Sequence, residues 1–256
     1  MLCEEIFASK KYAALYRPLV LRICDEEYKK YDNNKDRVKA VKHTLHAMYG
    51  AYLNSADIFK KANKLLDVQD PDIGRLLNLH ASTKERMRHL NDFYSFIFES
   101  IGVVESVLDI GCGLNPFTLP YFPQKPLKYY AFDIDERIAG LNNRYFEHLC
   151  LPALAGCMDI SIETPKMTAD AAFLFKLLPL IERQSKGRSI RLLREINAKF
   201  LIITYPTTSL SGKEKGMKSF YTSAFVQMIA SDPDEGLFVF AKKQIGNELV
   251  YIVTAN

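Results

Sequence analysis

From about His80 to the C-terminus, short apolar segments of strand character alternate with amphipathic segments of helical period. The strand-like segments are residues 107–110, 129–133, 171–175, 200–204, 237–241 and 249–253. Such alternation is typical of a parallel sheet flanked by helices. The turn Ile245-Gly246-Asn247 between the last two segments predicts a hairpin and hence an antiparallel edge. A further strand is expected to end at Asp159-Ile160. With these six segments it predicts a doubly wound α/β fold with seven strands.

The first 79 residues have a helical pattern instead. Apolar residues recur at helical spacing in three segments, residues 20–31, 38–52 and 58–66. Asp70 followed by Pro71 predicts a further helix start, with Asp70 as the cap. We expect an all-helical N-terminal domain over residues 1–79 and an α/β domain over residues 80–256.

Positive charge is concentrated at the N-terminus. The chain has 256 residues, of which 48% are hydrophobic, and a net charge of +4. This composition excludes disorder. Residues 1–66 contain 13 Lys and Arg against 8 Asp and Glu, so the rest is close to neutral. Lys39, Lys42 and His46 share a stripe on the second predicted helix, which fits a solvated face and RNA phosphate contact about equally.

Cysteine usage and hydropathy limit the class of protein. The five cysteines form no C-x-x-C pair, and histidines do not cluster at zinc spacing. The sequence has no signal-peptide pattern and no run of 18 apolar residues. We expect a reduced, cytoplasmic protein that binds neither a structural metal nor a membrane.

A glycine motif directly follows the first strand-like segment. Leu108-Asp-Ile-Gly-Cys-Gly113 allows a tight turn and close approach of a ligand to Gly111 and Gly113. Asp133 ends the next segment, at a spacing suited to a carboxylate that accepts both ribose hydroxyls of an adenosine. A pyrophosphate-binding G-x-G-x-x-G would need glycine at position 116, which is Pro116. S-adenosylmethionine is therefore favoured over a nicotinamide dinucleotide.

Other polar residues complete a candidate cofactor site. Ser82 and Glu85 form a capping-box pattern, which predicts a helix whose N-terminus attracts an anion. Asp159 and Ile160 lie where a third strand should end, so Asp159 can accept from an adenine amino group. We interpret Cys112 as a small filler and not as a nucleophile, because a cytosine-C5 mechanism needs a thiol where the chain has Lys176.

The spacing of glycine and lysine residues in one further segment excludes a nucleotide-binding phosphate loop. The segment Ser211-Gly-Lys-Glu-Lys-Gly216 lacks the Gly-x4-Gly-Lys-Ser/Thr pattern, so we reject an NTPase.

Several sequence motifs together resemble those of the aminoglycoside-resistance methyltransferases that modify N7 of guanine 1405 in the 16S rRNA decoding site. They are His80-Ala-Ser-Thr-Lys-Glu-Arg86, Leu108-Asp-Ile-Gly-Cys-Gly-Leu-Asn-Pro116, Phe175-Lys-Leu-Leu-Pro179, Ser209-Leu-Ser-Gly-Lys-Glu-Lys-Gly-Met217 and Ile245-Gly-Asn-Glu-Leu-Val-Tyr251. The helical N-terminal extension also resembles that of the family. The resemblance implies a Rossmann-like methyltransferase fold, S-adenosylmethionine as cofactor and 16S rRNA in the 30S subunit as substrate.

The resemblance also implies a set of cofactor contacts. These are His80, Ala81, Ser82, Arg86, Gly111, Asp133, Asp159, Ile160, Phe175 and Gln184, to which the glycine motif adds Gly113. Arg86 could pair with the methionine carboxylate. Phe175 would provide an apolar wall for adenine, and Gln184 a weaker polar contact.

The target atom determines which further residues are needed. Guanine N7 carries a free lone pair, so its methylation needs no general base and positioning dominates catalysis. Lys176 could donate to guanine O6 or to the phosphate of the nucleotide. Glu182 and Glu248 could accept from guanine N1–H and N2. For RNA contact outside the base pocket we expect Lys10, Lys11, Lys39, Lys42 and His46, with Lys213 and Lys215 near the active-site edge.

We therefore predict a monomeric 16S rRNA (guanine-N7) methyltransferase. Two alternatives stay open. One is another enzyme, a methyltransferase for another RNA site or a small molecule. The other is a noncatalytic rRNA-binding protein that retains the fold. A nicotinamide-dependent oxidoreductase is the least favoured, because of Pro116.

Overall fold

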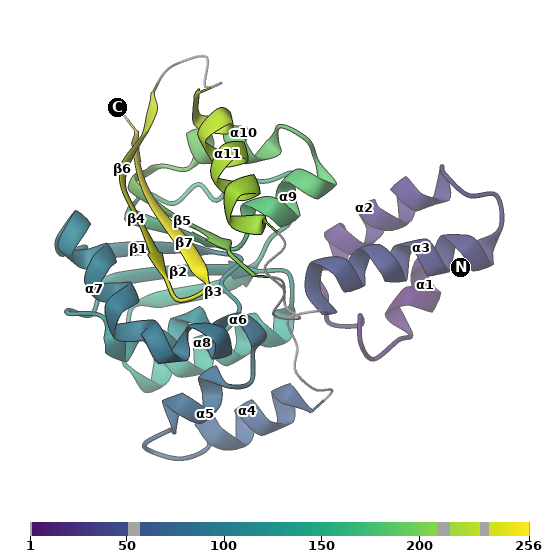
Figure 1. Ribbon diagram of the computed structural model, residues 1–256. Coiled ribbons are helices and arrows are strands. Elements are labelled where there is room, and N and C mark those ends of the chain that lie inside the picture. Colours follow the sequence, from purple (N-terminus) through teal and green to yellow (C-terminus); the bar gives the residue numbers. More distant parts are fainter. Residues whose placement is uncertain (1, 51–56, 209–215, 231–235, 256) are drawn as a thin grey trace.

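The computed structural model describes residues 2–50, 57–208, 216–230 and 236–255. Figure 1 shows a small helical bundle beside a larger body built on one sheet. The bundle consists of α1 (Leu2–Phe7), α2 (Arg17–Tyr28), α3 (Asn34–Leu45) and a π-helical turn, η1 (His46–Gly50). Asn33 caps α3, because its side chain accepts from the backbone N–H of Asp36 over 2.9 Å.

The sheet of the larger body has seven strands. They are β1 (Ser106–Ile110), β2 (Lys128–Asp133), β3 (Ala153–Cys157), β4 (Ala169–Phe175), β5 (Ala198–Pro206), β6 (Leu237–Ile245) and β7 (Glu248–Ala255). The order is β3-β2-β1-β4-β5-β7-β6, in which β7 runs antiparallel to both its neighbours and the other pairs are parallel. The predicted seven-stranded α/β fold with its antiparallel edge hairpin is confirmed.

Helices cover both faces of this sheet (Figure 1). One face carries α4 (Ile58–Leu66), α5 (Ile73–Leu77), α7 (Leu90–Ile101), the 3-10 helix η3 (Asn115–Tyr121) and α8 (Glu136–His148). The other carries α9 (Leu178–Gln184), α10 (Arg188–Glu195) and α11 (Met217–Ala230). Successive residues of β1 divide between the two cores: Val107 packs in the first and Leu108 in the second.

The helices of the first 79 residues belong to two different cores. Ile6, Leu19 and Leu45 of the bundle share a core of their own. Ala62 of α4 and Leu76 of α5 instead pack with the sheet. The change from bundle core to sheet core therefore falls between η1 and α4, earlier in the chain than the expected boundary at residue 79.

Two predicted helix caps are wrong, although a helix does begin near Ser82. Asp72, and not Asp70, caps α5, since its side chain accepts from the N–H of Arg75 over 2.9 Å. The helix near Ser82 is α6 (Ala81–Arg86), whose cap position is His80 without a side-chain capping bond. A 3-10 turn, η2 (Met87–His89), separates it from α7. The capping box does not form, because Glu85 pairs with groups on other elements.

Among the described residues, no helix combines the length and apolar character needed to cross a bilayer. Within the same ranges, His, Cys, Asp and Glu side chains do not gather in a group of three that could hold a metal ion.

Candidate functional site

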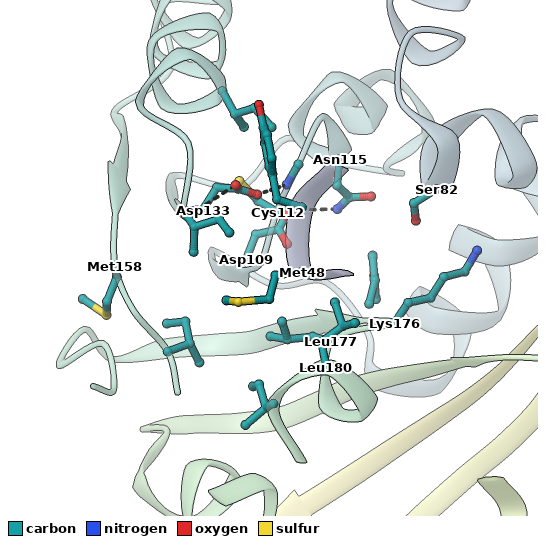
Figure 2. A pocket seen from close by; sticks show the side chains of 18 of the residues that line it. Met48, Ser82, Asp109, Cys112, Asn115, Asp133, Met158, Lys176, Leu177 and Leu180 are labelled. Atoms are coloured by element: carbon teal, nitrogen blue, oxygen red, sulfur yellow. Dashed lines mark hydrogen bonds between the residues drawn. The ribbon is translucent and has the colours of Figure 1, made fainter. Parts of the chain in front are cut away.

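A cavity of about 990 Å³, open to solvent, lies beyond the carboxyl ends of β1, β2 and β4. This edge of an α/β sheet is where ligands usually bind. Figure 2 shows Asp133 and Cys112 on one side of it and Leu177 and Leu180 on another. The predicted site residues that line it are His80, Ser82, Arg86, Gly111, Gly113, Asp133, Asp159, Ile160, Phe175, Lys176 and Gln184.

Backbone geometry explains the two glycines of the motif. Gly111 and Gly113 have φ of +67° and +49°, a region that side chains disfavour. A Cβ on Gly111 would lie 2.8 Å from Leu177, and one on Gly113 would lie 2.9 Å from the His80 ring. Both positions therefore require glycine because of neighbouring side chains as well as conformation.

Asp133 stands at the end of β2 and is held by backbone donors. Its Oδ2 accepts from the N–H of Gly113 over 2.8 Å, and its Oδ1 accepts from Ile134 over 2.7 Å. Burial raises the pKa of Asp133 to about 6, although the N–H of Gly113 acts to lower it. The carboxylate is thus a fixed acceptor that a ligand hydroxyl would help to keep ionised.

Arg86 is fully buried between two aromatic rings. Its guanidinium carbon lies 4.5 Å from the Phe93 centroid and 4.6 Å from the Phe175 centroid. Arg86 donates from Nε and Nη2 to the two carboxylate oxygens of Glu248, each over 3.0 Å, and from Nη1 to Asn115, also over 3.0 Å. Three of its five N–H donors are thereby used.

Glu248 does not have the position that we expected for a group contacting guanine. Its side chain is 1% exposed and does not line the cavity. Burial alone would raise the pKa of Glu248, but the charges of Arg86 and Lys176 lower it to about 2. Because Glu248 is the counter-ion of Arg86, its structural role is to hold that guanidinium, and the assignment as a base contact is corrected.

Glu182 and Ala81 also lie outside the cavity lining. Glu182 accepts from the backbone N–H of Gly187 over 2.6 Å and of Ser189 over 3.3 Å, so it caps the start of α10. Both carboxylate oxygens are therefore engaged with backbone at a helix end, and the contact of Glu182 with guanine stays a prediction. Gln184, two residues later, does line the cavity, and its Oε1 is buried without a hydrogen-bond partner.

Lys176 is held in an unusual backbone conformation at the end of β4. Its φ is +56°, and its N–H donates to the carbonyl of Thr204 over 3.0 Å. Its Nζ lies 2.6 Å from Glu85 and 3.4 Å from Glu248. The ammonium is therefore part of a carboxylate-paired cluster, and Lys176 lines the cavity.

Sequence reasoning missed a buried polar network beneath the glycine loop. Asp109 accepts from Asn115 over 2.9 Å and from the Tyr129 hydroxyl over 2.7 Å. Burial raises the pKa of Asp109 to about 6. Both Asp109 and Asn115 line the cavity (Figure 2). Both residues lie within the glycine motif, residues 108–116, so the sequence contained the residues of this network. Asn115 also accepts from Arg86 and so links the network to that side chain.

His80 forms part of the cavity wall next to the two cations. Burial, with the nearby charges of Lys176 and Arg86, lowers the pKa of His80 to about 4. The imidazole is therefore neutral at physiological pH. Its ring packs on Gly113, which identifies His80 as a support for the glycine loop.

The helical bundle contributes to the same cavity. Met48 and Tyr49 of η1 line it, and Figure 2 shows Met48 beside the cavity. Arg22 of α2 donates from Nε to Asp159 over 2.8 Å and from Nη2 to Ser161 over 2.8 Å. Neither contact was foreseen, because no local pattern links Arg22 to positions 137 and 139 residues away.

The expected RNA-contact residues of the bundle lie on its surface. Lys10, Lys11, Lys39 and His46 are exposed, and Lys42 is half-buried. Lys11 Nζ lies 2.9 Å from His46 Nδ1, which brings two of them together across the bundle. Lys213 and Lys215 lie outside the described residues.

Comparisons with known proteins agree on one family. The family model for ribosomal RNA methyltransferase (FmrO) matches residues 8–252. A Serratia marcescens protein called 16S rRNA (guanine(1405)-N(7))-methyltransferase is 34% identical over 98% of this chain and 96% of its own length. A Proteus mirabilis protein of the same name is 30% identical over 98% of this chain and 95% of its own length.

A solved structure is similar over the whole chain. The crystal structure of the 16S rRNA methyltransferase RmtF in complex with S-adenosyl-L-homocysteine has a TM-score of 0.90 and 31% identity. The match covers 100% of this chain and 97% of that one.

Proposed function

The chain belongs to the ribosomal RNA methyltransferase family FmrO, and from this premise we propose that it transfers a methyl group from S-adenosylmethionine to N7 of guanine 1405 in 16S rRNA. Full-length similarity to the relatives of that name supports this proposal. The observation that carries it is the cavity at the carboxyl edge of the sheet, which Asp133, Asp159 and Arg86 line together.

The residues of this cavity fit S-adenosylmethionine. Asp133 is a fixed acceptor suited to the ribose hydroxyls, and Asp159 is suited to the adenine amino group. Gln184 Oε1 is a buried acceptor that still needs a donor. Arg86 retains two N–H donors for the methionine carboxylate. When bound, S-adenosylmethionine supplies a methyl group activated by its sulfonium charge.

The chain's own contribution to the reaction is positioning. Guanine N7 has a free lone pair, so no side chain has to remove a proton from the attacking atom. This agrees with the carboxylates of the site, since Glu248, Glu182 and Asp109 are each engaged with other groups. The base must leave its stack to reach the methyl group, and the protein contributes by holding it in place.

Lys176 is the residue that we assign to the target nucleotide. A bare ammonium would oppose the positive charge that N7 methylation places on guanine. Glu85 and Glu248 both lie next to the Lys176 ammonium and offset its charge. Lys176 can therefore donate to guanine O6 or to the nucleotide's phosphate without a net repulsion of the product.

We propose that the helical bundle binds RNA around the target in the 30S subunit. The exposed Lys10, Lys11, Lys39 and His46, with Lys42, are suited to phosphate contacts. If the substrate is the 30S subunit, the protein acts in the cytoplasm, and we expect it to act as a monomer. Methylation removes the N7 acceptor of the guanine and adds positive charge, so cationic aminoglycosides lose affinity and the host becomes resistant.

The test is transfer of a labelled methyl group from S-adenosylmethionine to purified 30S subunits. We expect incorporation approaching one methyl group per subunit, and little with 50S subunits. The Asp133→Ala variant is the control, because it removes the ribose acceptor. Binding of 30S subunits without any transfer would instead support the noncatalytic rRNA-binding alternative.

A further inference from the structure

Two loops of the cofactor cavity are held from outside by the helical bundle. The first follows Asp133: the N–H of Tyr16 donates to Ile134 over 2.8 Å, and the N–H of Glu136 donates to Ala14 over 2.9 Å. The Tyr49 hydroxyl donates to the buried Asp135. The loop next to the ribose acceptor therefore has its shape fixed by the bundle.

The second loop contains Asp159, and here the contact is a charge pair. Asp159 is 1% exposed, so its carboxylate has almost no solvation from water. Arg22, whose side chain is 20% exposed, donates to Oδ2 of Asp159. The same guanidinium donates to Ser161 Oγ, and Ser161 in turn donates to Oδ1 of Asp159. Both carboxylate oxygens are thus oriented by one guanidinium.

We propose that Arg22 is a positioning residue for the adenine end of the cofactor cavity and that it acts through Asp159. Cofactor affinity then depends on the packing of the helical bundle against the sheet domain. This inference rests on the proposed S-adenosylmethionine site. It assigns a role in cofactor binding to a bundle that sequence reasoning connected only with RNA.

The physical reason lies in the cost of a buried, unpaired carboxylate. Without Arg22, Asp159 would have to recruit water or turn away. Each outcome removes a fixed acceptor for the adenine amino group. With Arg22 present, each Asp159 oxygen accepts one or two protein donors and keeps acceptor capacity toward the cavity.

Coupling of this kind is reciprocal. If packing of the bundle against the sheet domain raises the affinity for the cofactor, bound cofactor must stabilise that packing by the same factor. The surface that carries Lys39 and Lys42 belongs to the same bundle as Arg22. RNA binding and cofactor binding are therefore linked through a rigid element that serves both.

Calorimetric titration of the full chain with S-adenosylhomocysteine tests the proposal. We expect Arg22→Ala to weaken binding at least tenfold, and Arg22→Lys to recover part of that loss because it restores one donor and the charge. Arg37→Ala is the matched control: Arg37 donates to the carbonyl of Tyr31 and lies over the Tyr28 ring, within the same bundle. It should bind with parental affinity.

A double-mutant cycle separates positioning from general loosening of the fold. If Arg22 acts through Asp159, then Arg22→Ala should cost much less in an Asp159→Asn background than in the parent. Equal costs in both backgrounds, or parental affinity of Arg22→Ala, would overturn the inference. Failure of the parent chain itself to bind S-adenosylhomocysteine would instead contradict the proposed function, so the two failures are distinguishable.

Thermal unfolding of each variant shows whether a loss of affinity results from a loss of folded structure. We expect Arg22→Ala to unfold cooperatively, with a lower midpoint than Arg37→Ala because Asp159 has lost its charge partner, but to stay folded at the temperature of the titration. Should Arg22→Ala fail to fold, Ser161→Ala replaces it, because it removes the second contact of the same guanidinium. Parental affinity of Ser161→Ala together with parental affinity of Arg22→Lys would then overturn the inference.

Discussion

Arg86 and Glu248, 162 positions apart, form a bidentate ion pair in which both oxygen distances are 3.0 Å and neither side chain is more than 2% exposed. The pair joins α6 to the first residue of β7. Asn115 takes a third donor of the same guanidinium and ties the pair to the glycine loop. The hairpin edge of the sheet is therefore connected directly to the cofactor cavity.

Breaking this pair should be costly. We expect Glu248→Gln to reduce the free energy of unfolding by about 3–5 kcal/mol, since it leaves a buried guanidinium without its charge partner. Urea denaturation measures the loss. Asp67→Asn is the control, because Asp67 pairs with Arg144 at an exposed site and should lose less than about 1 kcal/mol. A loss below about 1 kcal/mol in Glu248→Gln would contradict the role given to the pair.

The same pair predicts an acid dependence of stability. The pKa of Glu248 is about 2 in the folded protein and 4.5 ordinarily. A lowered folded-state pKa contributes stability that is present above the ordinary pKa and is lost as the pH falls through the folded one. The difference in unfolding free energy between parent and Glu248→Gln should therefore shrink from pH 4.5 toward pH 2. A difference that is constant over this range would refute the assignment.

Cofactor affinity should depend on pH through Asp133. The ribose hydroxyls donate to an ionised carboxylate, and the pKa of Asp133 is about 6 without ligand. Binding should therefore tighten as the pH rises through that value, with release of a proton. Calorimetry in buffers of different ionisation enthalpy detects that proton. Asp133→Asn should bind more weakly and lose this dependence, whereas Asp109→Asn should keep it.

Lys176 should affect methyl transfer more than cofactor binding. In Lys176→Ala we expect affinity for S-adenosylhomocysteine to stay within about twofold, while single-turnover methylation of 30S subunits falls at least about tenfold through poorer positioning of the base. Quenched-flow or manual time courses with excess enzyme measure the rate. Methylation at the parental rate would show that Lys176 does not contact the nucleotide.

The bundle surface should control RNA binding without changing the cofactor site. Replacing Lys39 and Lys42 with Glu should weaken 30S binding and flatten its salt dependence, by roughly one unit of log-log slope for each phosphate that is no longer bound. The same change at Lys125 and Lys128, which are exposed before and at the start of β2, is the control. Equal effects at the two sites would mean that only net charge matters.

The sequence predicted the sheet and the glycine loop well because both depend on local patterns. The apolar runs of β1 and β2 and the positive φ of Gly111 and Gly113 follow from residue type and spacing. The cavity lining near those motifs was also foreseen. Short-range periodicity therefore suffices for the elements and for the loops that directly follow strands.

Charge pairs between distant elements could not be predicted in this way. Glu85 matched a capping box, yet it pairs with Lys176, which lies 91 residues away. Glu248 was expected to face guanine, but Arg86 occupies both its oxygens. In each case the carboxylate pairs with a cationic side chain from another element. Only the folded arrangement shows which partner prevails.

Mapping of the modified nucleotide tests the central claim most directly. Purified protein, 30S subunits and S-adenosylmethionine are incubated, and the 16S rRNA is cleaved chemically at N7-methylguanine and read by primer extension. We predict a single new stop at guanine 1405, absent with the Asp133→Ala variant and strongly reduced with Lys176→Ala. A stop at another nucleotide, or methylated rRNA without an N7-methylguanine stop, would contradict the account.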